Sequence, residues 1–201
     1  MESLQPSAAT TIVDIGVTPD ESTEDSNFLE KWYPYPERIT ATSIEDASYL
    51  ESSHPGLTFV RTSGDRLPFD DGQFDIGFSS AVLEHVGDQA HQRRFLDELL
   101  RVSKRFFITT PDRRFPVELH TFLPFVHWLP QRHHQRVLRA LGMTSWARTE
   151  NLNLLNEDEL RALFPDGVVP TIGGPRLLGM RSNLQAFGSS HGQGGATSKP
   201  E

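Results

Sequence analysis

Residues 64–86, GDRLPFDDGQFDIGFSSAVLEHV, decide the fold of this chain. They leave one strand-like segment, pass through an acidic turn and enter a second apolar run at residues 74–78, which Ser79 and Ser80 close. A helix-forming sequence begins directly afterwards, at Ala81. Strand, loop, strand and helix in this order build a parallel α/β sheet, and such sheets bind ligands beyond the carboxyl ends of their strands. The stretch therefore predicts an α/β fold with a ligand site near the two serines.

The segments on either side continue the alternation of strands and helices. Apolar or β-branched runs predict strands, and apolar residues at helical spacing predict helices. The expected strands cover residues 11–16, 38–43, 56–62, 74–78, 105–110, 167–172 and 182–187, and the expected helices cover residues 27–33, 44–53, 81–102, 132–141 and 156–164.

The central stretch resembles the middle of the class I S-adenosylmethionine-dependent methyltransferases of the small-molecule, methyltransferase type 11-like kind. LPFDDGQFD fits the family's LPF-x-D-x-x-FD run before the fourth strand, LEH fits the start of the next helix, and TPD at residues 110–112 fits the end of the fifth strand. The resemblance covers roughly residues 10–187. It implies a Rossmann-like three-layer α/β sandwich with a mostly parallel seven-stranded sheet, an antiparallel edge hairpin, and S-adenosylmethionine as cofactor.

By this resemblance, several residues of the central stretch would hold the cofactor. Asp65 is expected to accept a hydrogen bond from the adenine amine, with the backbone of Arg66 and Leu67 beside it. Ser79 and Ser80 are expected below the reacting methyl group.

The loop after the first strand departs from the family. A glycine-rich loop normally lets the backbone approach the cofactor, but here only Gly16 is present and the next two glycines are missing. The sequence DIGVTPD resembles a D-x-G-V-T-x-D loop found in some subfamilies. Asp14 and Asp20 would then flank the methionine end, and Thr18 would replace the glycine contacts. A methyltransferase-fold binding protein without catalysis is the alternative that this loop leaves open.

The second strand also departs from the family. Ser43 stands where a carboxylate normally accepts both ribose hydroxyls, and Glu45 follows shortly after it. Either Glu45 reaches back to the ribose, or it only begins a helix and the contact is weaker. The lack of this acid, together with the lack of a GxGxxG loop, disfavours a nucleotide-dependent oxidoreductase.

His85 and His120 are the two candidate catalytic residues. Each is expected in a loop beyond the carboxyl end of a strand, and imidazole titrates in the range that removing a proton from an acceptor hydroxyl requires. A structural role for either histidine is the alternative. Although Glu118 and His120 could share a metal site, we expect no metal, because the histidines show no HExxH or comparable helical spacing.

Charge and composition limit the function further. The formal net charge of −8 argues against nucleic-acid binding, and the absence of cysteine fits a reducing cytoplasm. Residues 1–100 carry −13 and residues 101–201 carry +5. The basic half favours an anionic or glycan-type small-molecule acceptor, although a solvated basic face would look the same. The sequence gives no oligomeric state.

The ends of the chain and one central region remain outside the common core. We expect a flexible leader at residues 1–9, a methyltransferase-like domain at 10–187 with an acceptor or lid region at 113–146, and a disordered tail at 188–201. Within that region, residues 115–130 mix apolar bulk with polar groups. They could cap an apolar acceptor, dip into a membrane surface to meet a lipid-linked one, or form a buried lid.

Overall fold

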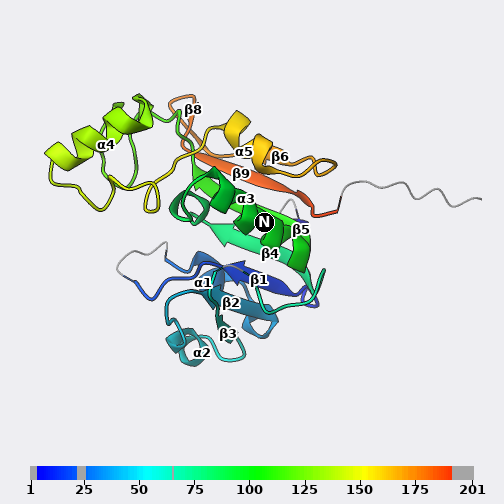
Figure 1. Cartoon of the computed structure of the whole chain (residues 1–201). Coiled ribbons are helices and arrows are strands. Elements are labelled where there is room, and N and C mark those ends of the chain that lie inside the picture. Colours follow the sequence, from blue (N-terminus) through cyan, green and yellow to red (C-terminus); the bar gives the residue numbers. More distant parts are fainter. Residues whose placement is uncertain (1–3, 22–25, 65, 192–201) are drawn as a thin grey trace, which may run out of the picture.

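A computed structural model describes residues 4–21, 26–64 and 66–191. Its centre is a seven-stranded sheet in the order β3-β2-β1-β4-β5-β9-β6 (Figure 1). The strands are β1 (Ile12–Ile15), β2 (Ile39–Ser43), β3 (Thr58–Arg61), β4 (Phe74–Ser80), β5 (Ser103–Pro111), β6 (Thr171–Gly173) and β9 (Asn183–Ser189). The first five strands along the chain are parallel, and β9 runs antiparallel to both β5 and β6. The expected parallel sheet with an antiparallel edge is confirmed.

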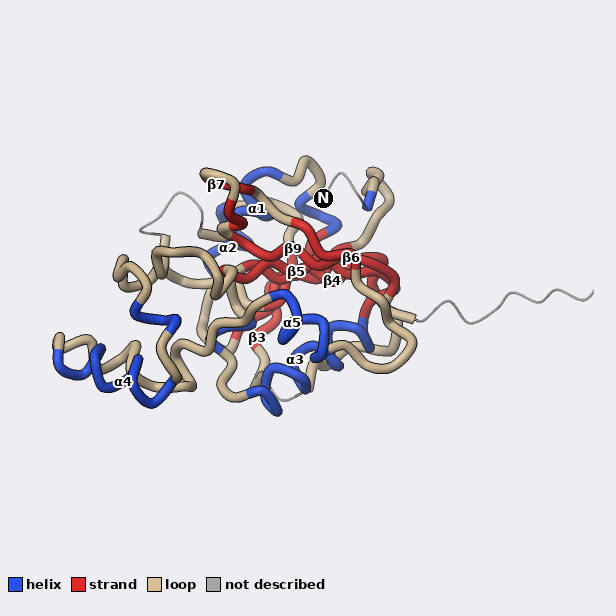
Figure 2. The backbone as a smooth tube through the Cα atoms, turned by 90° about the horizontal axis from the view of Figure 1, so that it is seen from above, coloured by secondary structure: helices blue, strands red, loops and turns tan. Residues whose placement is uncertain are grey.

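Helices cover both faces of the sheet. Figure 2 shows α1 (Phe28–Trp32) and α2 (Tyr49–Ser53) on one side, with α3 (Gln89–Val102) and α5 (Glu157–Leu163) on the other. Alternate residues of β1 explain this arrangement, because successive side chains of a strand point to opposite faces. Ile12 packs in the cluster that includes α1 and α2, whereas Val13 packs with α3 and α5. The three layers of the expected sandwich follow from these two cores.

The prediction of a helix starting at Ala81 is wrong. Residues Leu83–His85 form only a short 3-10 turn, and α3 begins at Gln89. Gly87 has a φ of 107°, which ends the turn, and the Asp88 side chain caps α3 by accepting a hydrogen bond from the backbone N–H of His91. Glu84 and His85 therefore lie in a connection at the carboxyl edge of the sheet instead of on a long helix.

The helix expected over residues 44–53 is also shorter than predicted. Only α2 is helical, because Asp46 accepts a hydrogen bond from the backbone N–H of Ser48 and forms a turn before it. By contrast, Asn156 and Glu159 form a complete capping box, and α5 starts where its sequence predicts.

Both expected flexible ends are partly packed. Leu4 is buried, and its carbonyl accepts a hydrogen bond from the Arg105 guanidinium at 2.6 Å, so the leader is anchored at this residue. At the other end, β9 continues through Gly188 and Ser189, which moves the start of the expected tail. The rest of the tail, residues 192–201, lies outside the described residues.

Residues between β5 and α5 are mostly irregular. They contain a 3-10 turn, η4 (Val126–Trp128), and one helix, α4 (Gln131–Ala140), which projects from the body in both ribbon views (Figures 1 and 2). A separate hairpin, β7 (Arg176–Leu177) and β8 (Met180–Arg181), was not expected from the sequence. Within the described ranges, we find no helix with the length and apolar character needed to cross a membrane.

Candidate functional site

The carboxyl ends of β2, β1 and β4 lie side by side, as a site at this edge requires. β1 pairs with β2 on one side and with β4 on the other. The Gly16 backbone N–H donates to the Thr42 carbonyl at 2.8 Å, and the buried Ser79 hydroxyl donates to the Ile15 carbonyl at 2.9 Å. Ser80 lies at the exposed end of β4, where its hydroxyl is 2.9 Å from that of Thr109. The structure therefore brings Gly16 and both serines to one edge.

Gly16 is placed under a tight constraint. Its φ is 105°, and a Cβ atom added there would come within 2.4 Å of Cγ2 of Val82. This backbone conformation favours glycine, and the space beside it is already filled by the segment that follows β4. The one glycine retained from the family's loop is thus required by both conformation and packing.

Hydrogen bonds hold the unusual loop after Gly16 in place. The Asn27 side chain accepts from the Thr18 backbone N–H and donates to the Thr18 carbonyl, each at 2.9 Å. Tyr49 reaches the same carbonyl from α2 at 3.3 Å. The Thr18 hydroxyl accepts from the backbone N–H of Asp20. These contacts give the loop a defined shape without its second and third glycines.

Asp14 and Glu30 form a buried pair of carboxyl groups beneath this loop. Asp14 is 5% exposed and Glu30 is 2% exposed. Neither carboxyl oxygen of Glu30 has a hydrogen-bond partner in the described part of the chain. Burial raises the pKa of both groups, and the Glu30 charge raises the pKa of Asp14 further. Both carboxyl groups therefore hold their protons to a higher pH than free carboxyl groups do.

Replacing Glu30 with glutamine should weaken the pH dependence of stability. Raised pKa values mean that the folded chain keeps protons that the unfolded chain releases above its ordinary pKa values of 3.8 and 4.5. The free energy of unfolding is thus highest below those values and falls as pH rises through the raised pKa values. In Glu30→Gln this decline should be smaller. Urea unfolding from about pH 4 to about pH 8 measures it, because that range begins near the ordinary pKa values and extends above them. The exposed Glu37→Gln variant is the control, and an unchanged pH slope in Glu30→Gln would contradict the pairing.

Of the expected ribose contacts, Ser43 is buried at the end of β2 and Glu45 is exposed. The Ser43 hydroxyl accepts a hydrogen bond from the Glu45 backbone N–H at 3.2 Å. This contact turns the chain after β2. Glu45 begins no helix, because α2 starts only at Tyr49.

The adenine region is described only in part. Asp65 lies outside the described residues. Arg66 is exposed, while Leu67 is buried and packs in the core with α3. The Leu67 backbone N–H donates to the Glu98 carboxylate at 3.0 Å. That N–H is consequently occupied by a contact within the protein.

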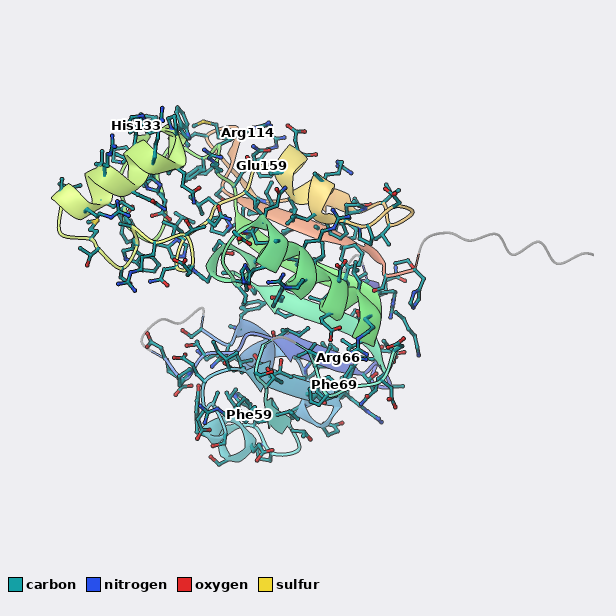
Figure 3. All side chains as sticks on the ribbon, in the orientation of Figure 1. Phe59, Arg66, Phe69, Arg114, His133 and Glu159 are labelled. Atoms are coloured by element: carbon teal, nitrogen blue, oxygen red, sulfur yellow. The ribbon has the colours of Figure 1, made fainter. Side chains whose placement is uncertain are left out.

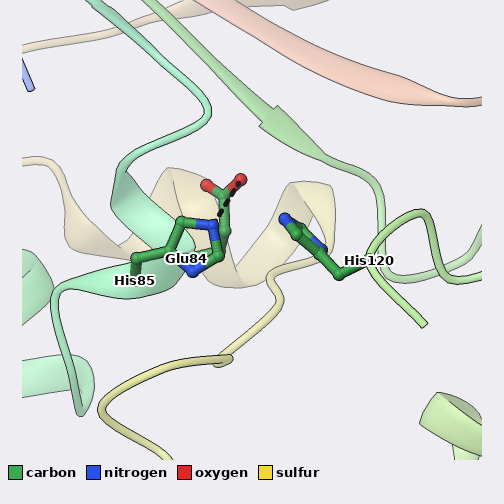
Figure 4. Close-up of side chains that lie close together, drawn as sticks. All are labelled: Glu84, His85 and His120. Atoms are coloured by element: carbon green, nitrogen blue, oxygen red, sulfur yellow. Dashed lines mark ion pairs between the residues drawn. The ribbon is translucent and has the colours of Figure 1, made fainter. Parts of the chain in front are cut away.

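His85 and His120, which are far apart in sequence, meet in the structure. Their ring centroids are 4.8 Å apart, with the rings nearly perpendicular. Figure 4 shows both rings directed towards the carboxylate of Glu84, which follows β4. The Thr110 hydroxyl, at the end of β5, donates to this carboxylate at 2.9 Å. The two candidate catalytic residues are thus brought together beside the ends of β4 and β5.

A hydrogen-bond network fixes the orientation of His120. Its Nδ1 lies 2.6 Å from Glu118, and the Glu118 carboxylate also accepts from the backbone N–H and hydroxyl of Thr121, each at 2.7 Å. Burial raises the pKa of Glu118, but the hydrogen bonds from His120 and Thr121 outweigh it and lower the pKa to about 2. Because Glu118 is ionised, Nδ1 of His120 carries the proton and donates it. Nε2 of the neutral ring is therefore the free proton acceptor.

The electrostatics of His120 favour its protonated form. Burial lowers the pKa of His120, but the hydrogen bond and charge of Glu118 outweigh burial and leave the pKa raised above 6.5. His85 is oriented differently, since its Nδ1 lies 2.6 Å from the Asn151 carbonyl. Trp146 packs against both rings, with centroid distances of 6.0 Å and 5.0 Å.

Glu84 is the most buried member of the cluster. Its side chain is fully buried, and Oε1 has no hydrogen-bond partner among the described residues. Burial raises the pKa of Glu84 more than the charge of His85 lowers it. One ligand atom each from Glu84, His85 and His120 lies within 4.8 Å of the others, a spacing that would admit a divalent cation. We expected no metal because the histidines lack a metal-binding spacing along the sequence, whereas this set is assembled from distant segments.

Comparisons with known proteins agree with the fold. Residues 26–106 match the methyltransferase domain family. A S-adenosylmethionine-dependent methyltransferase from Mesorhizobium loti is 16% identical, with a TM-score of 0.61, over 92% of this chain and 94% of that one. One from Methanosarcina mazei is 18% identical, with a TM-score of 0.54, over 90% and 92%. The YcgJ protein from Bacillus subtilis is 18% identical, with a TM-score of 0.54, over 81% of this chain, which spans only 63% of that protein. No curated protein matches in sequence.

The chain therefore has the fold of the class I S-adenosylmethionine-dependent methyltransferases, and residues 26–106 match the methyltransferase domain family. The cofactor of this class is S-adenosylmethionine. The residues at the end of β1 fit such a group, because its methionine end is cationic and the buried carboxyl groups of Asp14 and Glu30 lie there without a basic partner among the described residues. Gly16 lets the chain turn beside them where Val82 leaves no room for a side chain.

Three residues that shape the site were not predicted from the sequence. Glu30 looks like an ordinary helical glutamate, and only the docking of α1 on β1 buries it. Trp146 and Asn151 lie in an irregular segment, where no periodicity predicts which side chains turn inward. Because these contacts are made between distant segments, no local signal in the sequence could have indicated them.

Proposed function

We propose that this chain transfers a methyl group from S-adenosylmethionine to a hydroxyl of a small-molecule or glycan-type acceptor. The observation that carries the proposal is the meeting of His85 and His120 at the carboxyl edge of the sheet, where Gly16, Ser79 and Ser80 also lie. The bound cofactor would supply an activated methyl group on a sulfonium. The protein then mainly has to position the acceptor and remove its proton.

His120 is the better placed of the two bases. Its Nδ1 is held by ionised Glu118, so Nε2 is fixed in direction and free to accept a proton from the acceptor hydroxyl. The positive charge that forms on the ring is stabilised by Glu118 and by Glu84 nearby. His85 would line the same space and orient the hydroxyl. A positioned base of this kind accelerates such a step by about 10² to 10⁴-fold.

Residues 113–146 would form the acceptor region. An open hollow of about 380 Å³ lies there, lined by Arg113, Arg114, Trp128 and Asn156. Trp128 offers a flat apolar surface, and the two guanidinium groups, which pair with Glu159 and Asp158, supply polar surface, a combination suited to a sugar-like or anionic group. Arg114 lies near the start of α5 (Figure 3), where its guanidinium pairs with the Asp158 carboxylate at 2.6 Å. The positive charge of the second half of the chain supports the same class of acceptor.

Removing metal ions should leave the methyl-transfer rate unchanged. This prediction separates a histidine base from a metal ion held by the three side chains in Figure 4. The measurement compares the rate before and after dialysis against a chelator. A lost rate that returns on addition of zinc would instead assign the activation of the hydroxyl to a metal.

Turnover is tested by release of S-adenosylhomocysteine in the presence of phenols, simple glycosides and glycolipids. Release that depends on a hydroxyl-bearing acceptor supports the proposal. Binding of S-adenosylmethionine without turnover of any acceptor would favour the alternative, a binding protein that has kept the fold. The altered loop after Gly16 and the serine at position 43 are the observations behind that alternative.

A further inference from the structure

We propose that residues 119–129, together with α4, form a surface that docks on an anionic lipid bilayer. We call residues 119–129 the apolar loop. Docking itself does not require the proposed methyl transfer. The link to a lipid-linked acceptor, argued last, does rest on it.

The apolar loop exposes an unusual amount of apolar surface. Phe122 is 74% exposed, Phe125 54% and Trp128 48%, and Leu119 and Leu129 are also exposed. The rings of Phe125 and Trp128 pack edge to face, with centroids 4.9 Å apart, so they form one patch. Large apolar patches on a protein surface mark interaction sites with proteins or membranes. The expectation of a plain buried lid is wrong for these side chains.

The backbone holds these rings outward at an energetic cost. Phe122 and Phe125 have φ values of 55° and 63°, in a region that bulky residues rarely adopt. Hydrogen bonds enforce the shape: the Phe122 N–H donates to the Glu118 carbonyl at 2.8 Å, and the Phe125 N–H donates to the Pro116 carbonyl at 2.7 Å. Strain of this kind persists only where the surrounding structure imposes it, and it is common at functional sites. The exposed rings are therefore a fixed feature of the loop.

The charge beside the patch indicates what covers it. Residues 119–149 contain no aspartate or glutamate, and they include Arg132, Arg136, Arg139 and Arg148. The first three arginines are spaced four and three residues apart, so they share one face of α4. All three are exposed, whereas His134 and Leu138 on the opposite face are buried. Among the described residues, none of the three forms a salt bridge.

Exposed apolar rings on one segment and a stripe of arginines on the helix that packs against it together match the chemistry of an anionic bilayer. The rings enter the boundary between headgroups and acyl chains, and the arginines meet the phosphates. An acidic protein partner would meet the same arginines, but it would need a complementary apolar hollow for rings that stand out from the surface. A bilayer accepts them without one.

Docking would bring the bilayer to the catalytic cluster. The apolar loop begins between Glu118 and His120, the pair that fixes the proposed base. An acceptor anchored in the bilayer could then present its hydroxyl to His120 without leaving the membrane. If the proposed function holds, this inference narrows the acceptor class to lipid-linked molecules.

Vesicle flotation tests the surface without cofactor or acceptor. The full chain is mixed with vesicles of phosphatidylcholine alone, or with about 30% phosphatidylglycerol to supply negative surface potential. We expect binding to the anionic vesicles and loss of binding in about 0.5 M salt, where surface charges are screened. Phe122→Ser combined with Phe125→Ser should weaken binding by at least about tenfold, since two exposed rings no longer enter the lipid. Arg132→Gln, Arg136→Gln and Arg139→Gln together should do the same.

Matched controls lie elsewhere on the surface. Trp32 is 73% exposed, and Arg93 and Arg94 are exposed on α3. Trp32→Ser and the double variant Arg93→Gln, Arg94→Gln should bind vesicles like the parent chain. A thermal unfolding scan confirms that each variant is folded. Failure of the parent chain to bind anionic vesicles, or equal weakening by the controls, would overturn the proposal, and neither result would affect an assay of methyl transfer to soluble acceptors.

Discussion

Replacing His120 with glutamine is expected to lower the methyl-transfer rate by about 10² to 10⁴-fold, the contribution of a positioned base. The affinity for S-adenosylmethionine should not change, because the proposed role of His120 is to take the proton of the acceptor and not to hold the cofactor. Rate constants at saturating cofactor and a binding titration separate these two quantities. Glutamine keeps the size and polarity of the side chain, so the change mainly removes the titrating nitrogen.

The pH profile adds a readout that a structural histidine would not give. The base acts only when neutral, so the rate should rise with pH through the pKa of His120, which lies above 6.5. In Glu118→Gln the hydrogen bond from a charged partner is lost, and burial alone would lower that pKa. The acid limb of the profile should then move to lower pH.

His133 provides the matched control for this pair of variants. It lies on α4 (Figure 3), and among the described residues its ring is hydrogen-bonded only to the side chain of neighbouring Arg132, at 3.2 Å. His133→Gln should leave both the rate and the pH profile unchanged for a soluble acceptor. A His120→Gln rate within a few-fold of the parent rate would remove His120 from the chemistry.

Gly16→Ala is expected to destabilise the chain and to abolish cofactor binding. An alanine at a φ of 105° is strained, and its Cβ atom would overlap the Val82 side chain, which lies 2.4 Å from the Cβ position. Strained backbone of this kind costs about 1 to 3 kcal/mol, and the overlap adds to it. Movement of the loop would also displace Thr18 from Asn27. Urea unfolding and a binding titration measure the two effects.

Two further variants separate conformation from packing. Gly142 also has a positive φ, 78°, but a Cβ atom there would meet nothing within 4 Å. Gly142→Ala should therefore cost only about 1 kcal/mol, the penalty of the conformation alone. Adding Val82→Ala to Gly16→Ala removes the overlap and should restore part of the lost stability. Equal losses in Gly16→Ala and Gly142→Ala, with no rescue, would mean that the close approach of Val82 has no effect.

The fold could be predicted because its signals are local. Each strand of the parallel sheet is an apolar or β-branched run, and residues 64–86 contain the order of elements that such a sheet requires. The prediction failed where two adjacent residues redirected the chain. Gly87 and Asp88 restart the helix after Glu84 and His85, and periodicity alone joined the two parts.

The site could be predicted only residue by residue. His85 and His120 were each recognised as candidates from their position after a strand, but no sequence pattern showed that their rings would touch. The sequence left open whether Phe122 and Phe125 are buried or exposed, because an apolar run fits either arrangement. Their left-handed backbone conformation could not be predicted from it. Contacts between distant segments decide both features.

Calorimetric titration of the chain with S-adenosylmethionine tests the central claim most directly. We expect saturable binding at one site per chain, and loss of that binding in Gly16→Ala but not in His120→Gln. An absence of binding at millimolar cofactor, with the chain folded, would contradict it.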